Sequence, residues 1–182
     1  MSTLSKLLLT ALFLTALGTG TAQASAPQAE ARAPSAAELR RYMPRMKSEV
    51  LRYRAAIQKT GRAFEPGLLP ATQLAYLRSS QEDFTRIAAR LERVRRPASL
   101  RVTHGHLVGA VKRVSVALGR FLAAGEQFVR DKNETLLVER NRRAAAQLEE
   151  AERLQDRWAN ALRASARRAK VSIPAWLKNF RS

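Results

Sequence analysis

Apolar side chains recur at alternating spacings of four and three residues along most of the chain after residue 35. A helix advances about 100° per residue, so this spacing keeps them on one face as an apolar stripe. Four such runs occur, separated by stretches that contain proline, glycine or charged residues. Their stripe positions are, in chain order, Leu39, Met43, Met46, Val50, Tyr53 and Ile57; Leu74, Leu77, Phe84, Ile87, Leu91 and Val94; Leu100, His104, Leu107, Val111, Val114, Leu118, Phe121, Gly125 and Phe128; and Leu137, Asn141, Ala144, Leu148, Ala151, Gln155, Trp158, Leu162, Ser165 and Ala169. The pattern predicts an all-α protein.

Capping and helix-breaking residues mark where these runs begin and end. Ser35 and Glu38 form a Ser-x-x-Glu capping box, in which each side chain accepts a hydrogen bond from the backbone N–H of the other residue. Pro44 lies inside the first run, so either the first turns are kinked or the regular helix starts near this proline. Residues 61–70, GRAFEPGLLP, predict a loop, and Pro97 ends the second run.

Four amphipathic helices with short connections predict one antiparallel four-helix bundle over residues 35–170. The third and fourth helices are the longest, so they can extend beyond the first two as a coiled-coil hairpin. Small side chains in these two helices allow their backbones to approach closely. They are Gly105, Gly109, Ala110, Ala117 and Ala124 in the third helix and Ala144, Ala145, Ala151 and Ala161 in the fourth.

The two histidines of the chain lie in residues 103–107, THGHL. On a helix His106 is rotated about 200° from His104, so the two rings face opposite sides and are poorly placed to share a metal ion. His104 belongs to the apolar stripe, which predicts a buried imidazole hydrogen-bonded across the bundle. Asn141 and Gln155 are further polar stripe positions, which either fix the helix register or line a small polar pocket. We expect no metal and no cofactor.

The sequence contains no recognisable catalytic motif. We find no G-x-S-x-G, no P-loop, no dinucleotide fingerprint and no H-E-x-x-H. With two histidines and no cysteine, few side chains can exchange protons near neutral pH. We therefore expect that the protein is not an enzyme.

The first 24 residues have the pattern of a cleaved signal peptide. Lys6 precedes an apolar run over residues 7–17, and residues 22–24, AQA, match the small-x-small pattern of signal peptidase sites. A transmembrane helix is the alternative, but the run is shorter than the roughly 20 residues that span a bilayer. Cleavage would leave a chain that starts at Ser25, with residues 25–34 as a flexible lead-in. The expected location is extracytoplasmic, in the periplasm or secreted, with no integral membrane span after cleavage.

The chain is strongly basic, with 33 Lys and Arg against 15 Asp and Glu and a formal net charge of +18. Such an excess favours association with nucleic acid, anionic lipid head groups or acidic envelope polymers. The alternative is that many arginines and alanines merely reflect a GC-rich genome, without selection for binding.

Basic residues concentrate in two parts of the chain, and we take these parts as the candidate binding surface. Residues 86–120 carry nine basic residues against Glu92 alone, and no acidic residue follows Arg157. The acidic cluster between these parts, Glu149, Glu150, Glu152 and Asp156, can pair with arginines on a neighbouring helix or form a solvated face. The candidate binding residues are Arg86, Arg90, Arg93, Arg95, Arg96, Arg101, Lys112, Arg113, Arg167, Arg168, Lys170, Trp176, Lys178, Phe180 and Arg181.

Residues 171–182 form a basic, aromatic C-terminal tail. Pro174 can open a short helix that places Trp176, Leu177 and Phe180 on one side, with cationic side chains beside them. Aromatic rings next to cations suit a membrane interface or stacking on nucleic-acid bases. The alternative is that Trp176 and Phe180 fold back and cap the end of the bundle core, and we favour this alternative.

Together these features predict an exported, non-enzymatic helical-bundle protein. Its basic surface would bind an acidic envelope polymer, an anionic lipid surface or a partner protein. An extracytoplasmic nucleic-acid-binding module is the first alternative, and it requires binding that weakens steeply with salt. A structural or chaperone-like bundle is the second, and it requires binding to apolar peptide with little salt dependence.

Overall fold

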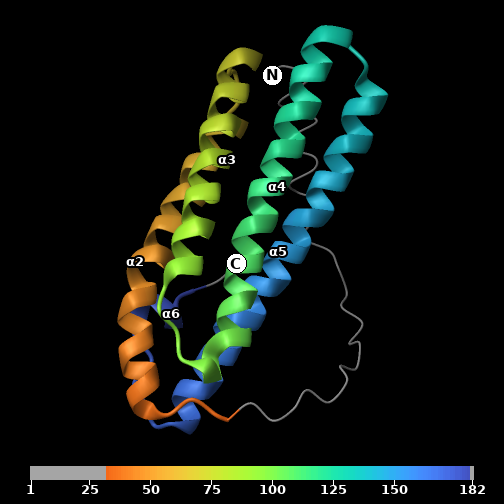
Figure 1. The fold of residues 1–182 in the computed structure, drawn as a ribbon. Helices are drawn as coiled ribbons and strands as arrows, with labels where there is room; N and C mark the ends of the chain where they lie inside the picture. The colour runs from red at the N-terminus through yellow and green to blue at the C-terminus, as the bar shows by residue number, and fades with distance from the viewer. Residues whose placement is uncertain (1–31, 181–182) are drawn as a thin grey trace.

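A computed structural model describes residues 32–180, and this part of the chain is all-helical (Figure 1). The four long helices are α2 (Ala36–Gly61), α3 (Pro70–Arg93), α4 (Arg101–Asp131) and α5 (Glu134–Arg168). Three short helical turns, η2 (Arg62–Phe64), η3 (Ala98–Leu100) and α6 (Ala175–Lys178), lie between or after them. The third and fourth long helices have 31 and 35 residues, against 26 and 24 for the first two, as predicted.

Each long helix packs mainly on its neighbour in sequence. The α4–α5 pair has the most extensive contact, α3 packs on α4, and α2 packs on α3 (Figure 1). These contacts are compatible with the expected bundle. The signal peptide, residues 1–24, most of the lead-in and Arg181 lie outside the described residues, and residues 32–34 of the lead-in are not helical.

The capping box at the start of α2 is confirmed. The backbone N–H of Ser35 donates to Glu38 Oε2 at 2.7 Å, and the N–H of Glu38 donates to Ser35 Oγ at 3.2 Å. Helix α2 therefore begins directly after Ser35 and continues through Pro44. This excludes the alternative in which the regular helix starts near the proline. The missing N–H of Pro44 removes one helical hydrogen bond, and the flanking turns hold the helix together.

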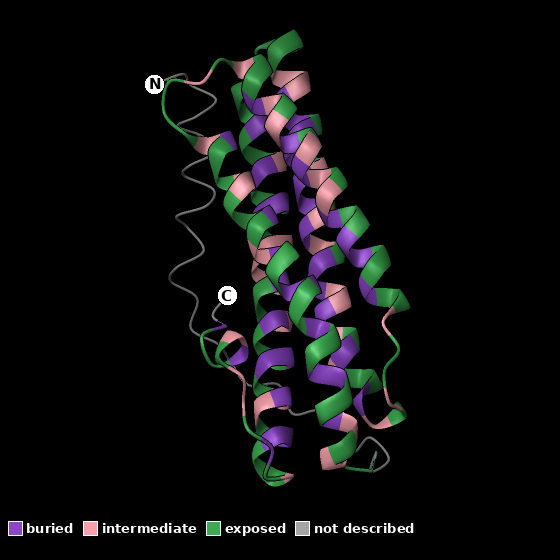
Figure 2. Cartoon of the chain, turned by 90° about the vertical axis from the view of Figure 1, so that its left-hand side faces the viewer, coloured by how far each residue is buried: buried purple, intermediate pink, exposed green. Residues whose placement is uncertain are grey.

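The predicted apolar stripes form the interior of the protein (Figure 2). Most stripe residues are buried, including the polar residues His104, Asn141 and Gln155. Ile57 is an exception, because it is 44% exposed while Ala56 occupies the inward position at 5%. The prediction for Ile57 was wrong. Ile57 lies five full turns after Leu39 and keeps the direction of the stripe, but near the end of α2 the covered side of the helix includes Ala56 instead, because the neighbouring elements determine which side is buried.

Gly125 and Gly109 of α4 lie against side chains of the neighbouring helices. A Cβ on Gly125 would lie 2.6 Å from Leu74 Cδ2 of α3, and one on Gly109 would lie 3.4 Å from Leu154 Cδ1 of α5. Larger side chains at Gly125 would therefore force Leu74 to move. Glycine at position 125 thus lets Leu74 pack closely against α4, whereas the contact at Gly109 is an ordinary van der Waals distance.

After α5 the chain reverses and packs against the helices. Lys170 adopts a left-handed conformation with φ 52°, and the N–H of Val171 donates to Ala166 O at 2.8 Å, which is the hydrogen bond of a Schellman motif. Pro174 then precedes α6, as the sequence predicted. Leu177 and Phe180 are buried at 0% and 3% exposure, so the tail belongs to the same hydrophobic core as the long helices.

Candidate anion-binding groove

The basic residues predicted as a binding surface are solvent-accessible wherever the structure describes them. Arg113 is half-buried, and the others are exposed. They do not form one surface, because the structure distributes many of them among separate clefts. Two of these clefts lie between α2 and the α3 side of the molecule, and we call them together the α2–α3 groove. Its basic residues are Arg41, Arg45, Arg52 and Lys59 of α2, Arg86 and Arg90 of α3, and Arg95 and Arg96 of the connection to α4.

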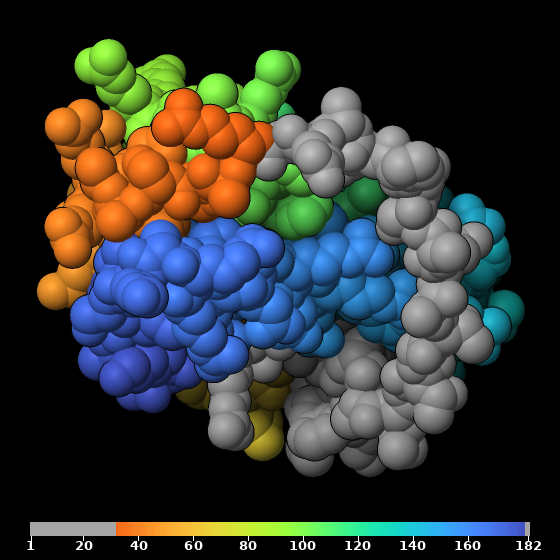
Figure 3. All heavy atoms as spheres, turned by 90° about the horizontal axis from the view of Figure 1, so that it is seen from below, coloured from red at the N-terminus to blue at the C-terminus, as the bar shows by residue number. Residues whose placement is uncertain are grey.

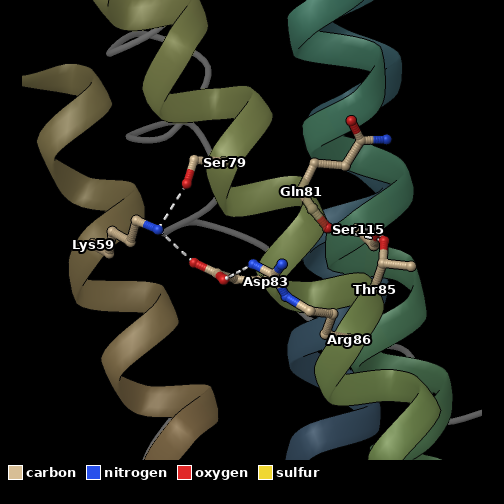
Figure 4. Close-up of polar contacts among 7 residues, drawn as sticks. All are labelled: Lys59, Ser79, Gln81, Asp83, Thr85, Arg86 and Ser115. Carbon is tan, nitrogen blue, oxygen red and sulfur yellow. Dashed lines mark hydrogen bonds and ion pairs between the residues drawn. The ribbon is translucent and has the colours of Figure 1, made fainter.

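An ion-pair network lies in the cleft between the second half of α2 and the middle of α3 (Figure 4). Lys59 Nζ donates to Asp83 Oδ2 at 2.6 Å and to Ser79 Oγ at 2.8 Å. Arg86 donates to the other carboxylate oxygen of Asp83 at 2.6 Å. Although burial raises the pKa of Asp83, the hydrogen bonds and charges of Lys59 and Arg86 outweigh it, and the pKa is lowered. Asp83 is therefore ionised at neutral pH and holds both cations in place.

The other face of α3 is fixed to α4. Thr85 Oγ1 donates to Gln81 O at 2.9 Å and lies 2.8 Å from Ser115 Oγ of α4 (Figure 4). Helix α3 is thus hydrogen-bonded to α2 on one side and to α4 on the other. These contacts restrict the position of the helix backbone that carries Arg86.

The cleft at the opposite end of the groove is lined by four arginines, Arg41, Arg45, Arg95 and Arg96, and has a volume of about 520 Å³. Glu38 is its acidic lining residue, and its carboxylate is engaged in the capping box. Hydrogen bonds from Ser35 lower the pKa of Glu38, so it stays ionised.

None of these four arginines forms an ion pair with a described carboxylate. Arg45 donates to the carbonyl oxygen of Arg95 at 3.2 Å, and Arg96 donates to that of Glu92 at 3.4 Å. A carbonyl oxygen carries only a partial charge, so most of the positive charge of this cleft is uncompensated. An anion entering the cleft would relieve the mutual repulsion of the guanidinium groups.

The α2 side of the groove was not among the predicted binding residues. Arg41, Arg45, Arg52 and Lys59 lie within about 40° of one another round the helix axis, so they form one basic stripe. This spacing was visible in the sequence. Helix α2 carries seven basic residues against Glu38 and Glu49, and only the helix face, not a count along the chain, groups these four together.

Several predicted residues lie outside the groove. Lys112 of α4 pairs with Glu92 at 2.5 Å, and Arg113 donates to Gln147 of α5 at 3.5 Å. Arg167 and Lys178 line another cleft beside α5.

Two members of the acidic cluster, Glu149 and Glu150, pair with an arginine of their own helix. Arg153 lies 3.7 Å from Glu149 and 3.6 Å from Glu150. The cationic partner of these two carboxylates is therefore on α5 itself, rather than on a neighbouring helix as the sequence had allowed.

The tail aromatics pack onto Trp158 of α5. The rings of Trp158 and Trp176 stack with centroids 6.4 Å apart and an interplanar angle of 23°, and Phe180 meets Trp158 edge-on at 5.1 Å. Phe180 is almost fully buried, so its ring is not accessible to a ligand. The alternative in which the tail folds back describes this arrangement. Trp176 remains half-buried and lines the cleft beside α2.

Both ring nitrogens of His104 have hydrogen-bond partners. Nδ1 lies 2.9 Å from the hydroxyl of Tyr42, and Nε2 lies 2.8 Å from the carbonyl oxygen of Leu91. His106 lies on the other side of α4 and is half-buried. Residues 32–180 contain no group of three or more His, Asp or Glu side chains that could hold a metal ion.

The described helices include none that is both long and apolar enough to cross a membrane. Comparisons of the chain with protein-family models, with curated proteins and with solved structures gave no significant match.

Proposed function

We propose that this chain is an exported, non-enzymatic binding protein. In this proposal its four long helices form an antiparallel bundle, and the α2–α3 groove binds an acidic polymer of the cell envelope. The observation that carries the proposal is the cleft lined by Arg41, Arg45, Arg95 and Arg96, none of which pairs with a described carboxylate. Guanidinium groups suit such a role, because each presents a planar fork of donors that matches a phosphate or carboxylate.

The contacts between α2 and α3 support the antiparallel arrangement. Arg45, near the start of α2, contacts Arg95, which follows the end of α3. Lys59, near the end of α2, contacts Asp83 in the middle of α3. Later positions in α2 thus meet earlier positions in α3.

The separation of the two clefts along α2 favours an extended ligand that reaches both over a small anion. The basic stripe of α2 runs from Arg41 to Lys59, which is about 27 Å along a helix. Arg52 lies between these ends, where Glu49 pairs with it. A linear polyanion can contact such a row of cations at several points, and each contact would release counterions.

A titration that follows the fluorescence anisotropy of a labelled polyanion would test this proposal. The protein used is the chain from Ser25, because every described core residue lies between Leu39 and Phe180. The probes are a labelled DNA duplex and a labelled acidic polysaccharide such as alginate, each at several salt concentrations. We expect both to bind, with the polysaccharide retaining more of its affinity as salt rises. Stronger binding of DNA throughout would favour the nucleic-acid-binding alternative.

A matched pair of variants distinguishes polyanion binding at the groove from binding that depends only on the net positive charge. Arg41→Gln/Arg45→Gln removes two cations from the groove, and Arg130→Gln/Arg142→Gln removes two exposed cations elsewhere. We expect the groove variant to weaken polyanion binding at least tenfold and to reduce the salt slope by about two, and the control to have a much smaller effect. Equal losses in both variants would show that the net charge acts without a defined site. Absence of binding even at low salt would favour the genome-composition explanation and the chaperone-like alternative.

A further inference from the structure

A second cleft on α2 differs in chemistry from the α2–α3 groove. It lies between α2 and the tail, and we call it the α2–tail cleft. One side is formed by α2, and the other by residues 170–172 with Pro174 and Trp176. The α2 residues are Arg40, Met43, Pro44 and Lys47. Seen from below, the surface of α2 borders directly on the blue surface of the C-terminal part of the chain (Figure 3).

Three cations line the α2–tail cleft, and none of its described lining residues is acidic. The cations are Arg40 and Lys47 of α2 and Lys170 at the end of α5. One face of α2 contains positions 40, 47, 51 and 54. The spacings between successive positions are seven, four and three residues, each close to a whole number of helical turns. Arg54 continues this face and donates to the carbonyl oxygen of Asn179 at 2.9 Å, which holds the tail beside α2.

The same face also presents apolar surface. Trp176 lines the cleft while its ring stacks on the buried Trp158. Leu51, on the same face of α2 as Lys47, is 47% exposed. A half-buried tryptophan beside lysine and arginine is typical of protein surfaces that lie at a membrane interface.

We propose that the α2–tail cleft binds anionic phospholipid at a membrane surface, with Arg40, Lys47 and Lys170 at the head groups and Trp176 at the interface. A hydrated acidic polymer would satisfy the cations but would gain nothing from Trp176 and Leu51. A phospholipid supplies both an anionic phosphate and an apolar acyl region. The site is separate from the α2–α3 groove, so this inference does not depend on the function proposed for that groove.

Vesicle co-sedimentation with the chain from Ser25 provides the test. Vesicles of phosphatidylcholine alone are compared with vesicles that also contain phosphatidylglycerol, at a physiological ionic strength of about 0.15 M. We expect binding only to the anionic vesicles, and soluble glycerol phosphate should not displace the protein. Displacement by glycerol phosphate would show that the cleft recognises the phosphate group without a membrane, and would overturn the proposal.

Lys170 and Lys132 offer a matched pair of substitutions. Both have a left-handed backbone, with φ 52° and 54°, and both lie just after a long helix. Glycine fits such a conformation better than lysine, so Lys170→Gly and Lys132→Gly should both preserve the fold. Lys132 belongs to the α4–α5 turn, at the opposite end of the molecule from α6 (Figure 1).

We expect Lys47→Gln/Lys170→Gly to weaken binding to anionic vesicles about thirtyfold, because each cation near an anionic surface contributes about a factor of five. Arg130→Gln/Lys132→Gly removes the same charge and should weaken binding no more than a few fold. Arg41→Gln/Arg45→Gln should also retain vesicle binding, whatever its effect on polymer binding. Equal weakening by the variants at the two ends would overturn the proposal.

Tryptophan fluorescence gives an independent readout. The chain has two tryptophans, and Trp158 is fully buried. Brominated acyl chains in anionic vesicles should quench the emission of Trp176, and Trp176→Phe should abolish this quenching. An unquenched wild-type protein that nevertheless sediments with vesicles would show that Trp176 does not reach the interface, and would refute its assigned role.

Discussion

The hydroxyl of Tyr42 and Nδ1 of His104 lie 2.9 Å apart, in the buried contact between α2 and α4. Nε2 of the same ring lies 2.8 Å from the carbonyl oxygen of Leu91 in α3. Because a carbonyl can only accept, Nε2 carries the proton, and Nδ1 accepts a hydrogen bond from Tyr42. Burial raises the pKa of the Tyr42 hydroxyl, which therefore remains a donor throughout the physiological range. One imidazole thus connects three helices.

Tyr42→Phe should destabilise the protein by about 1 to 2 kcal/mol, because it leaves the buried Nδ1 of His104 without its donor. Urea unfolding followed by circular dichroism measures this loss. Tyr76→Phe is the control, since Tyr76 is only half-buried. Similar small effects of both substitutions would show that the Tyr42–His104 hydrogen bond contributes little net stability.

Stability should fall as the solution becomes acidic, because His104 is neutral in the folded protein. Burial lowers the pKa of His104, and the nearby Arg96 acts in the same direction against the opposing hydrogen bond to Leu91. The unfolded state takes up a proton near the ordinary pKa of 6.5, whereas the folded state resists it. The contribution of His104 is therefore complete above pH 6.5 and is lost as the pH falls from there through the lowered folded pKa.

The comparison of wild type with His104→Gln isolates this effect. The wild type should lose free energy of unfolding over that pH interval, and His104→Gln should show a shallower loss. His106→Gln is a necessary control, because burial and Arg157 also lower the pKa of His106. If the His104 variant kept the full pH dependence, the neutral state assigned to His104 would be wrong.

Arg163 holds the tail against α5. Its guanidinium group donates to the carbonyl oxygen of Leu177 at 2.9 and 3.1 Å and also to that of Phe180. Arg163→Lys retains the charge but not the planar fork, and should destabilise the tail contact by about 1 kcal/mol. Limited proteolysis is expected to cleave near residues 171–180 sooner in this variant. Unchanged cleavage would indicate that the stacking of the tail aromatics on Trp158 suffices to hold the tail.

Asn141 is buried at 2% exposure, and neither side-chain polar atom has a hydrogen-bond partner in the described structure. Replacement by leucine removes the cost of desolvating an unpaired amide. Asn141→Leu should therefore raise the free energy of unfolding by about 1 kcal/mol or more. Thermal unfolding with size-exclusion chromatography measures both stability and oligomeric state. A loss of stability, or a change in oligomeric state, would support the register role that the sequence suggested.

The sequence by itself determined the helices of this protein. Local periodicity specified which face of each helix is apolar, and the capping box at Ser35 and Glu38 specified where α2 starts, because both depend on residues within one or two turns. The burial of His104 and Asn141 follows from their stripe positions for the same reason.

Only the tertiary structure decided which polar faces meet. Arg41 and Arg95 line one cleft, although they are far apart in the chain, because α2 packs beside α3. The partners of His104 and the contacts of Phe180 with Trp158 likewise depend on packing between distant segments. Helix periodicity specifies the direction of a side chain relative to its own axis. The packing of whole helices, governed by the fit of their apolar faces, determines what that side chain contacts.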